Sequence, residues 1–185
     1  PLGGPSPKIK LDKPKEFKLK NGIRVLVVEN HKLPRINYSL RFDRKPIVEG
    51  EKTGVISLLG SMLGNGTTNI PKDDFNEEVD FLGAGINVGF GSGFAFTLTK
   101  NNERVLDLFS DAVINPLLTE EEFEKEKDKL IEGLKSQKKD IDAISGRVGD
   151  ALSYGKSHAY GEFISEQTID NIKFEDILDY HGKYF

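Results

Sequence analysis

Residues that could bind a metal or act as a nucleophile are sparse in this sequence. The chain has no cysteine, which excludes disulfides, thiol nucleophiles and cysteine-based metal sites. Its three histidines, His31, His158 and His181, lie far apart. No two of them have the i, i+4 spacing that places a pair of imidazoles on one helical face. We therefore predict no metal site built from these histidines, which we expect in loops or on the surface, with His181 packed near Tyr180 and Tyr184.

A glycine-rich segment over residues 83–93 is the second candidate for chemistry. It lacks the Gly-Lys-Ser/Thr signature and the strand-to-helix setting of a phosphate-binding loop. Its pattern instead predicts a β-hairpin, with Ile86 and Val88 in the first strand and Phe94 and Phe96 in the second.

Composition excludes further classes of function. The 185 residues include 26 basic and 30 acidic side chains, so nucleic acid is a poor candidate partner. No run approaches the roughly 18 consecutive apolar residues of a membrane span. We expect an extended, proline-rich leader over residues 1–15 and one domain over residues 16–185. Because the chain starts at Pro1, we also expect that its natural N-terminus has been removed.

Strand patterns come first along the chain and helix patterns follow. Two β-prone runs joined by Asn21-Gly22 predict a hairpin, and alternating apolar residues predict a third strand over residues 36–42. Thr119 and Glu122 form a capping-box pair at the start of a long charged helix. Helical spacing predicts helices over residues 51–63, 71–82, 103–113, 120–139, 142–154 and 174–184, with a short turn at 165–169. This order predicts an α+β fold, a mainly antiparallel sheet with helices packed on one face.

Six segments, in the right order, resemble the N-terminal domain of the insulinase or mitochondrial-processing-peptidase family, M16. The resemblance covers about residue 16 to the end, and it implies that family's fold. The segments are Phe17 to Val25, Val28 to Pro34, Gly54 to Leu63 with Gly66-Thr67, Leu82-Gly83-Ala84 with Asn87, Asn115-Pro116 with residues 121–127, and His158-Ala159-Tyr160-Gly161. The last segment has Ala where the family usually has Pro.

The resembled family is a zinc peptidase with an inverted His-x-x-Glu-His sequence. Its two histidines bind zinc, its glutamate takes a proton from the metal-bound water, and a glutamate on a later helix is the third ligand. Glu126 fits the family's earlier acidic residue on that helix, whereas Glu132 points about 100° away from the ligand position. The resemblance places the four functional positions at Ser57, Gly60, Ser61 and Gly133. A serine hydroxyl is a poor zinc ligand and glycine supplies neither ligand nor base, so we expect no catalytic residue, metal or cofactor here.

The resemblance also implies a peptide-binding strand at the edge of the sheet. An extended peptide would add as another strand, and Asn87, Val88 and Gly89 are the candidate pairing residues. The alternative is a plain hairpin with bulges. Gly60 and Gly64, within one short helix, indicate either space for a close partner backbone or a tolerated weakness.

The leading hypothesis is a catalytically inactive M16-type domain, the scaffold or peptide-binding half of a two-part zinc peptidase. Its partner would be a catalytic M16 domain or subunit, and zinc would be held only there. One alternative is an active zinc metallopeptidase, longer or hetero-oligomeric, whose His-x-x-Glu-His lies elsewhere. Another is a purely structural subunit, like the core proteins of respiratory complexes. We expect the domain to be truncated before its last strand, and we favour a bacterial periplasmic or cell-envelope location.

Overall fold

The computed structural model describes residues 13–185, so most of the expected leader lies outside the described residues. It separates them into two compact units, residues 13–34 and Arg35–Phe185. The small unit is the predicted hairpin, in which β1 (Lys15–Lys18) pairs antiparallel with β2 (Arg24–Val27). Gly22 takes a φ of 93° in its turn, a conformation that glycine adopts without strain.

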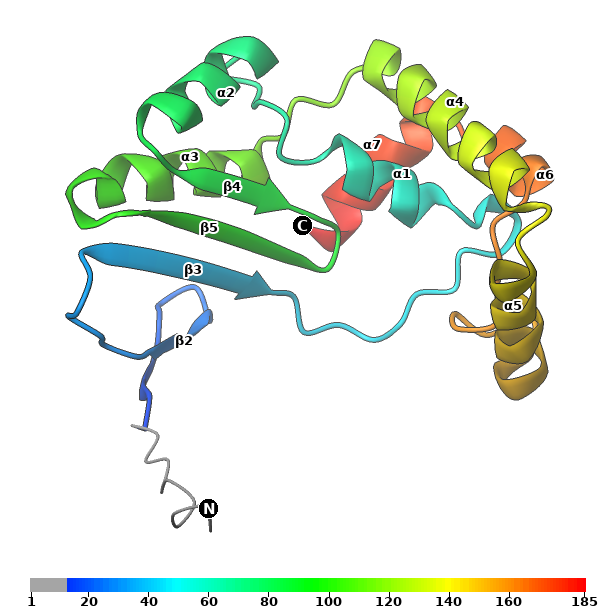
Figure 1. Cartoon of the computed structure of the whole chain (residues 1–185), viewed down its shortest axis with the longest axis horizontal. Helices are drawn as coiled ribbons and strands as arrows, with labels where there is room; N and C mark the ends of the chain where they lie inside the picture. Colours follow the sequence, from blue (N-terminus) through cyan, green and yellow to red (C-terminus); the bar gives the residue numbers. More distant parts are fainter. Residues whose placement is uncertain (1–12) are drawn as a thin grey trace, which may run out of the picture. The chain divides into compact units, whose positions relative to one another are not determined.

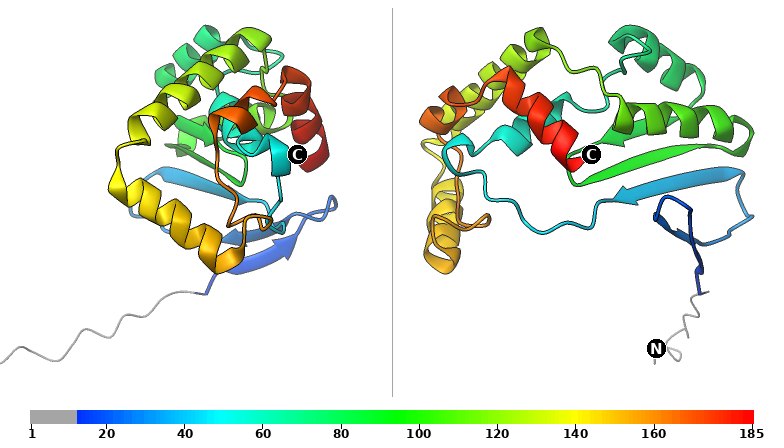
Figure 2. Two further views of the ribbon diagram at one scale, coloured as in Figure 1. Left: turned by 90° about the vertical axis from the view of Figure 1, so that its right-hand side faces the viewer. Right: turned by 180° about the vertical axis from the view of Figure 1, so that it is seen from behind.

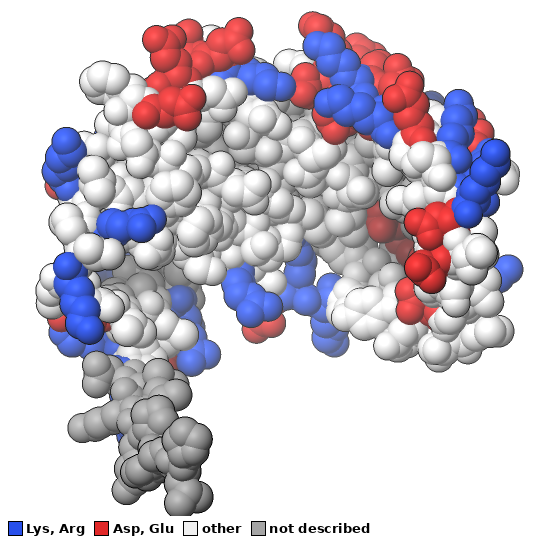
Figure 3. Space-filling model, viewed as in Figure 1, with Lys and Arg blue, Asp and Glu red and all other residues white. Residues whose placement is uncertain are grey.

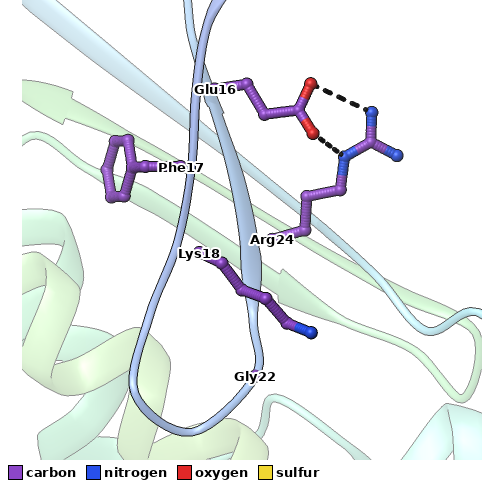
Figure 4. Close-up of a pocket in the computed structure, with 5 residues that line it drawn as sticks. All are labelled: Glu16, Phe17, Lys18, Gly22 and Arg24. Atoms are coloured by element: carbon purple, nitrogen blue, oxygen red, sulfur yellow. Dashed lines mark hydrogen bonds and ion pairs between the residues drawn. The ribbon is translucent and has the colours of Figure 1, made fainter.

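The concave side of this hairpin carries one ion pair and the side chain of Lys18. Glu16 and Arg24 face each other across the two strands, with 2.7 Å between Nε and Oε1, and Phe17 projects to the other side (Figure 4). Each charge is therefore compensated by the other, and we assign no site to this unit.

The larger unit contains a three-stranded antiparallel sheet in the order β3-β5-β4 (Figure 1). Its strands are β3 (Arg35–Arg41), β5 (Ser92–Leu98) and β4 (Gly85–Val88). Successive side chains alternate between the faces, so Ala95 is fully buried while Phe94 is 45% exposed. Small residues on the inner face make room for a helix.

Helix α3 (Asn102–Ile114), preceded by the short turn η2 (Thr99–Asn101), covers that inner face (Figures 1 and 2). A Cβ at Gly93 would lie 2.8 Å from Cζ of Phe109, so this strand position requires glycine. Helix α2 (Lys72–Phe81) precedes β4 and contributes Phe75 to the core.

Helix α1 (Val55–Met62) is central and packs against α4 (Glu120–Gln137) and α7 (Phe174–Tyr184). The helix expected to begin at residue 51 begins at Val55, because Gly50–Lys52 forms a separate 3-10 turn, η1. The largest fully buried apolar side chains come from α1, α2, α3, α4 and the last two helical segments: Val55, Leu58, Leu59, Met62, Phe75, Val105, Leu108, Phe123, Ile169, Ile172 and Ile177.

The remaining helices lie beyond α4. Helix α6 (Glu166–Asp170) contacts α4, whereas α5 (Ile141–Tyr154) buries none of its residues. Thr119 is confirmed as the N-cap of α4, since its Oγ1 accepts a hydrogen bond from the Glu122 amide at 3.3 Å. The reciprocal half of the predicted capping box is not formed, because the Glu122 side chain pairs with Lys72 instead. The α+β class with helices packed on the sheet is also confirmed. Across residues 13–185, no helix combines the length and apolar character needed to cross a bilayer.

Candidate functional site

Helix α1 buries one face and exposes the other. Leu58 and Leu59 are at most 1% exposed, whereas Ser57 and Ser61 are exposed and Gly60 is partly exposed between them. Residues four apart share a helical face, so the two serines lie one turn apart on the same side of α1. The Ser61 hydroxyl donates to the Leu58 carbonyl at 2.9 Å.

The C-terminal end of α1 lies against the β4–β5 hairpin. A Cβ at Gly64 would approach the Val88 amide nitrogen to 3.2 Å, and Gly64 has a φ of 76°. The backbone that packs closely against Gly64 is therefore that of strand β4 in the same chain. A Cβ at Gly60 would lie 3.8 Å from the amide nitrogen of Phe90, which is ordinary contact. An alanine fits there, but a longer side chain has to pass Phe90.

Helix α4 places Gly133 in a partly exposed position, and α4 packs against α1. Nothing lies within 4 Å of a Cβ built on Gly133, so space for a side chain exists. About two helical turns earlier, Glu126 pairs with Lys129, with 2.6 Å between Oε1 and Nζ. Glu132 is exposed and offers no substitute at the Gly133 position.

The donor set at these four positions does not fit zinc. Two neutral hydroxyls and two glycines present neither an imidazole nor a carboxylate, the groups that hold zinc in proteins. Within residues 13–185, no cluster of three or more His, Cys, Asp or Glu side chains has the arrangement of a metal site. No hydrolytic step through a metal is therefore derived from this face of α1.

The three histidines each have different local contacts. His31 belongs to the small unit, where Nε2 lies 3.5 Å from Oε2 of Glu29. His158 stacks on Tyr154, and its Nδ1 accepts the Tyr160 amide at 3.2 Å. His181 stacks on the ring of Phe185 rather than on a tyrosine. The rings of His158 and His181 have local packing roles, whereas the side chain of His31 is largely exposed.

Within the unit Arg35–Phe185, strand β4 is at one edge of the sheet and pairs only with β5. Gly89 donates to the Ser92 carbonyl at 2.8 Å, which makes that pair a hydrogen-bonded one. In an antiparallel ladder such pairs recur every second residue, so the main chain of Asn87 also faces β5. The outward main-chain groups are those of Ile86 and Val88. The register thus adds Ile86 to the residues that could pair with a peptide. The main-chain groups of Asn87 and Gly89, by contrast, point toward β5.

A carboxylate that sequence reasoning missed fixes the start of α1. Oε2 of Glu49 accepts hydrogen bonds from the amides of Gly54 at 3.0 Å and Ile56 at 2.9 Å. Glu162 in turn accepts from the amides of Glu49 at 2.9 Å and Gly50 at 2.7 Å. These bonds connect the loop after α5 to the helix that carries Ser57. The only sequence signal is an acidic residue shortly before the helix.

We expect Glu49→Ala and Glu49→Gln to differ in stability. Burial raises the pKa of the Glu49 carboxyl and the nearby Glu162 carboxylate adds to the rise, although the helix amides oppose it. Alanine leaves the Gly54 and Ile56 amides without acceptors, which costs about 1–3 kcal/mol. Glutamine keeps an acceptor and removes the charge, so it should cost much less.

The pH dependence of that difference follows from the raised pKa. The stability that Glu49 contributes is greatest below its unfolded pKa and is lost as pH rises through its folded pKa. In urea unfolding, the wild type should therefore lose stability relative to Glu49→Gln as pH rises from about 4 to 7, with each variant's helix content checked by circular dichroism. A Glu49→Ala variant as stable as wild type at pH 7 would contradict the capping role.

The fold and the altered face of α1 define a class: an α+β domain built like a zinc-peptidase domain, without a zinc donor set. A family model described as insulinase (peptidase family M16) matches residues 46–152, which include both α1 and Gly133. The chain belongs to that family. Comparison with curated protein sequences gives no match.

Two solved structures share the fold. The peptidase M16 inactive domain from Pseudomonas fluorescens aligns with a TM-score of 0.79 and 22% identity, over 91% of this chain and 43% of that chain. A protease from Helicobacter pylori aligns with a TM-score of 0.75 and 22% identity, over 94% of this chain and 44% of that one. The present chain thus spans less than half the length of either structure.

Proposed function

We propose that this chain is a catalytically silent M16 domain, the non-catalytic half of a two-part zinc peptidase. The observation that carries the proposal is the exposed face of α1, where Ser57, Gly60 and Ser61 offer no ligand or general base. The similar Pseudomonas structure, titled an inactive M16 domain, supports it. The catalytic half, with its zinc, would be a second M16 domain or subunit.

The same proposal gives the domain a role in holding extended peptide. The outward main chain of Ile86 offers a donor and an acceptor to an added strand, which gives affinity with little demand on sequence. At the neighbouring outward position, the Val88 amide lies against Gly64. Strand β3 lies at the opposite side of the three-stranded sheet. The β4 side is the one favoured, because Gly64 brings the altered end of α1 against Val88.

The experiment that tests the proposal measures peptide binding and cleavage together. We expect an extended peptide, N-acetylated, C-amidated and fluorescently labelled, to bind the purified protein equally well with added zinc or with chelator. Mass spectrometry should find it intact. Ile86→Pro removes one outward amide at an edge position that tolerates proline, so binding should weaken by about tenfold. Asn87→Ala, which changes only an exposed side chain, is the matched control and should bind normally.

Two outcomes would contradict this proposal in different ways. Cleavage that chelator abolishes and zinc restores would show an active peptidase. Absence of peptide binding, together with a stable complex with a larger assembly, would favour the purely structural subunit.

A further inference from the structure

Arg44 carries a positive charge that no carboxylate in the described chain compensates. Its guanidinium lies 3.8 Å from the ring centroid of Phe90 and 5.1 Å from that of Phe42. One nitrogen, Nη1, donates to the carbonyl of Tyr184 at 3.0 Å. Stacking of this kind uses the faces of the guanidinium and leaves its N–H groups in the plane for an acceptor.

One of those groups lacks an acceptor. Nη2 of Arg44 is buried and has no hydrogen-bond partner, and burial lowers the pKa of this side chain. Within residues 13–185, neither Arg44 nor the neighbouring Lys45 takes part in an ion pair. A buried charged donor without a partner is unfavourable. Because the Arg44 side chain as a whole is partly exposed, an anion that pairs with its guanidinium would offset that cost.

Arg44 borders an open cavity of about 350 Å³, within the size range of small-ligand sites. The cavity is lined by the segment after β3, one residue of α1, the β4–β5 turn and the loop after α5: Phe42, Arg44, Lys45, Pro46, Ile47, Glu49, Ile56, Phe90, Gly91, Ala159 and Tyr160. Basic side chains, with an acidic side chain among them, lie along the lower middle of the face in Figure 3, where Figure 1 shows the segment 42–49.

The walls of this cavity combine apolar and aromatic side chains with polar groups, and its charges are unevenly engaged. Glu49, the one acidic residue among them, already accepts the Gly54 and Ile56 amides through Oε2. Arg44 and Lys45 are adjacent in sequence and supply the cationic side. The ligand that matches this combination has a carboxylate directly beside an apolar group.

We propose that this cavity binds the free C-terminal carboxylate of a peptide whose last residue is apolar. The carboxylate pairs with Arg44 and Lys45, and the last side chain contacts Phe42, Ile47 and Ile56. A C-terminal residue places both groups on one Cα, whereas an Asp or Glu side chain carries its carboxylate without an apolar companion. This site is separate from the outward edge of β4 and does not require it.

The probe that tests the site is acetyl-Gly-Gly-Leu with a free C-terminus, titrated by calorimetry into the whole chain. We expect saturable binding, and the C-terminally amidated peptide should bind at least about tenfold more weakly. Equal affinity for both forms, or no binding up to about 10 mM, would overturn the proposal. So would inorganic phosphate that binds as tightly as the peptide, since that would indicate a general anion site.

Single variants distinguish an effect of the two cationic side chains on binding from an effect on folding. Arg44→Gln should reduce the affinity at least about tenfold, and Arg41→Gln, an exposed arginine outside the cavity, should not. Because Arg44 also packs against aromatic rings, Lys45→Glu provides a second variant at an exposed position. Retained affinity in a folded Lys45→Glu protein would count against the proposal even if Arg44→Gln fails to fold.

Discussion

Installing the family's zinc residues should create a zinc site in this chain. The combined variant Ser57→His, Gly60→Glu, Ser61→His and Gly133→Glu should bind one Zn²⁺ with a Kd below about 1 µM, roughly 8 kcal/mol of binding free energy. The two serine positions share an exposed helical face, and α4, which carries Gly133, packs against α1. Calorimetric titration should show no such site in the wild type.

The matched control is the same combined variant without one of its zinc ligands. With Ser61→Ala in place of Ser61→His, the stoichiometric site should disappear while the fold persists. Zinc at 100 times Kd should also raise the unfolding free energy of the full variant by about 2.7 kcal/mol and leave the control unchanged. The glutamate at position 60 has to pass Phe90, so a version that keeps Gly60 tests ligation alone. A folded variant without zinc affinity would refute the assignment of these positions.

Gly66→Ala should destabilise the domain by roughly 2–5 kcal/mol, a large part of the total stability of such a domain. Gly66 has a φ of 100°, and a Cβ there would lie 2.9 Å from both N and Cα of Lys72 and 3.2 Å from the carbonyl of Ile70. These are main-chain atoms that cannot move alone. Gly66 also accepts the Leu117 amide at 3.2 Å, which fastens the loop after α1 to the segment before α4.

Two glycines serve as controls for that result in urea unfolding. Gly50 has a φ of 61° but open space around its Cβ, so Gly50→Ala should cost only about 1–2 kcal/mol of conformational strain. Gly133 lies in a helix with open space, so Gly133→Ala should stabilise by about 0.5–1 kcal/mol. A Gly66→Ala variant no less stable than Gly50→Ala would refute the role of the main-chain contact.

Much of the secondary structure could be predicted because its causes are local. Asn21-Gly22 predicts the turn between β1 and β2, and Thr119 predicts the first residue of α4. The start of α1 was placed too early, because a 3-10 turn and Gly54, with a φ of 117°, separate Glu49 from the helix. Helical periodicity does not distinguish such a turn from the helix itself.

Contacts between distant residues were not readable from the sequence. Three such contacts exist only in the folded chain. Glu162 binds the segment before α1, Gly64 packs against Val88, and Arg44 stacks on Phe90. Each pair joins residues more than twenty positions apart, and neither residue alone indicates the other. The register of β4 likewise decided which main-chain groups face outward, because a shift of one residue exchanges the two sides.

By itself the sequence determined which chemistry is missing, since a serine or a glycine cannot supply an imidazole or a carboxylate in any fold. It also determined the order of strands and helices, because turn chemistry and hydrophobic periodicity act over a few residues. The tertiary structure alone decided that α1, which carries Ser57, Gly60 and Ser61, lies against the β4–β5 hairpin, and that Nη2 of Arg44 is buried without a hydrogen-bond partner. Burial and electrostatic pairing arise only when distant segments pack together, so no local pattern encodes them.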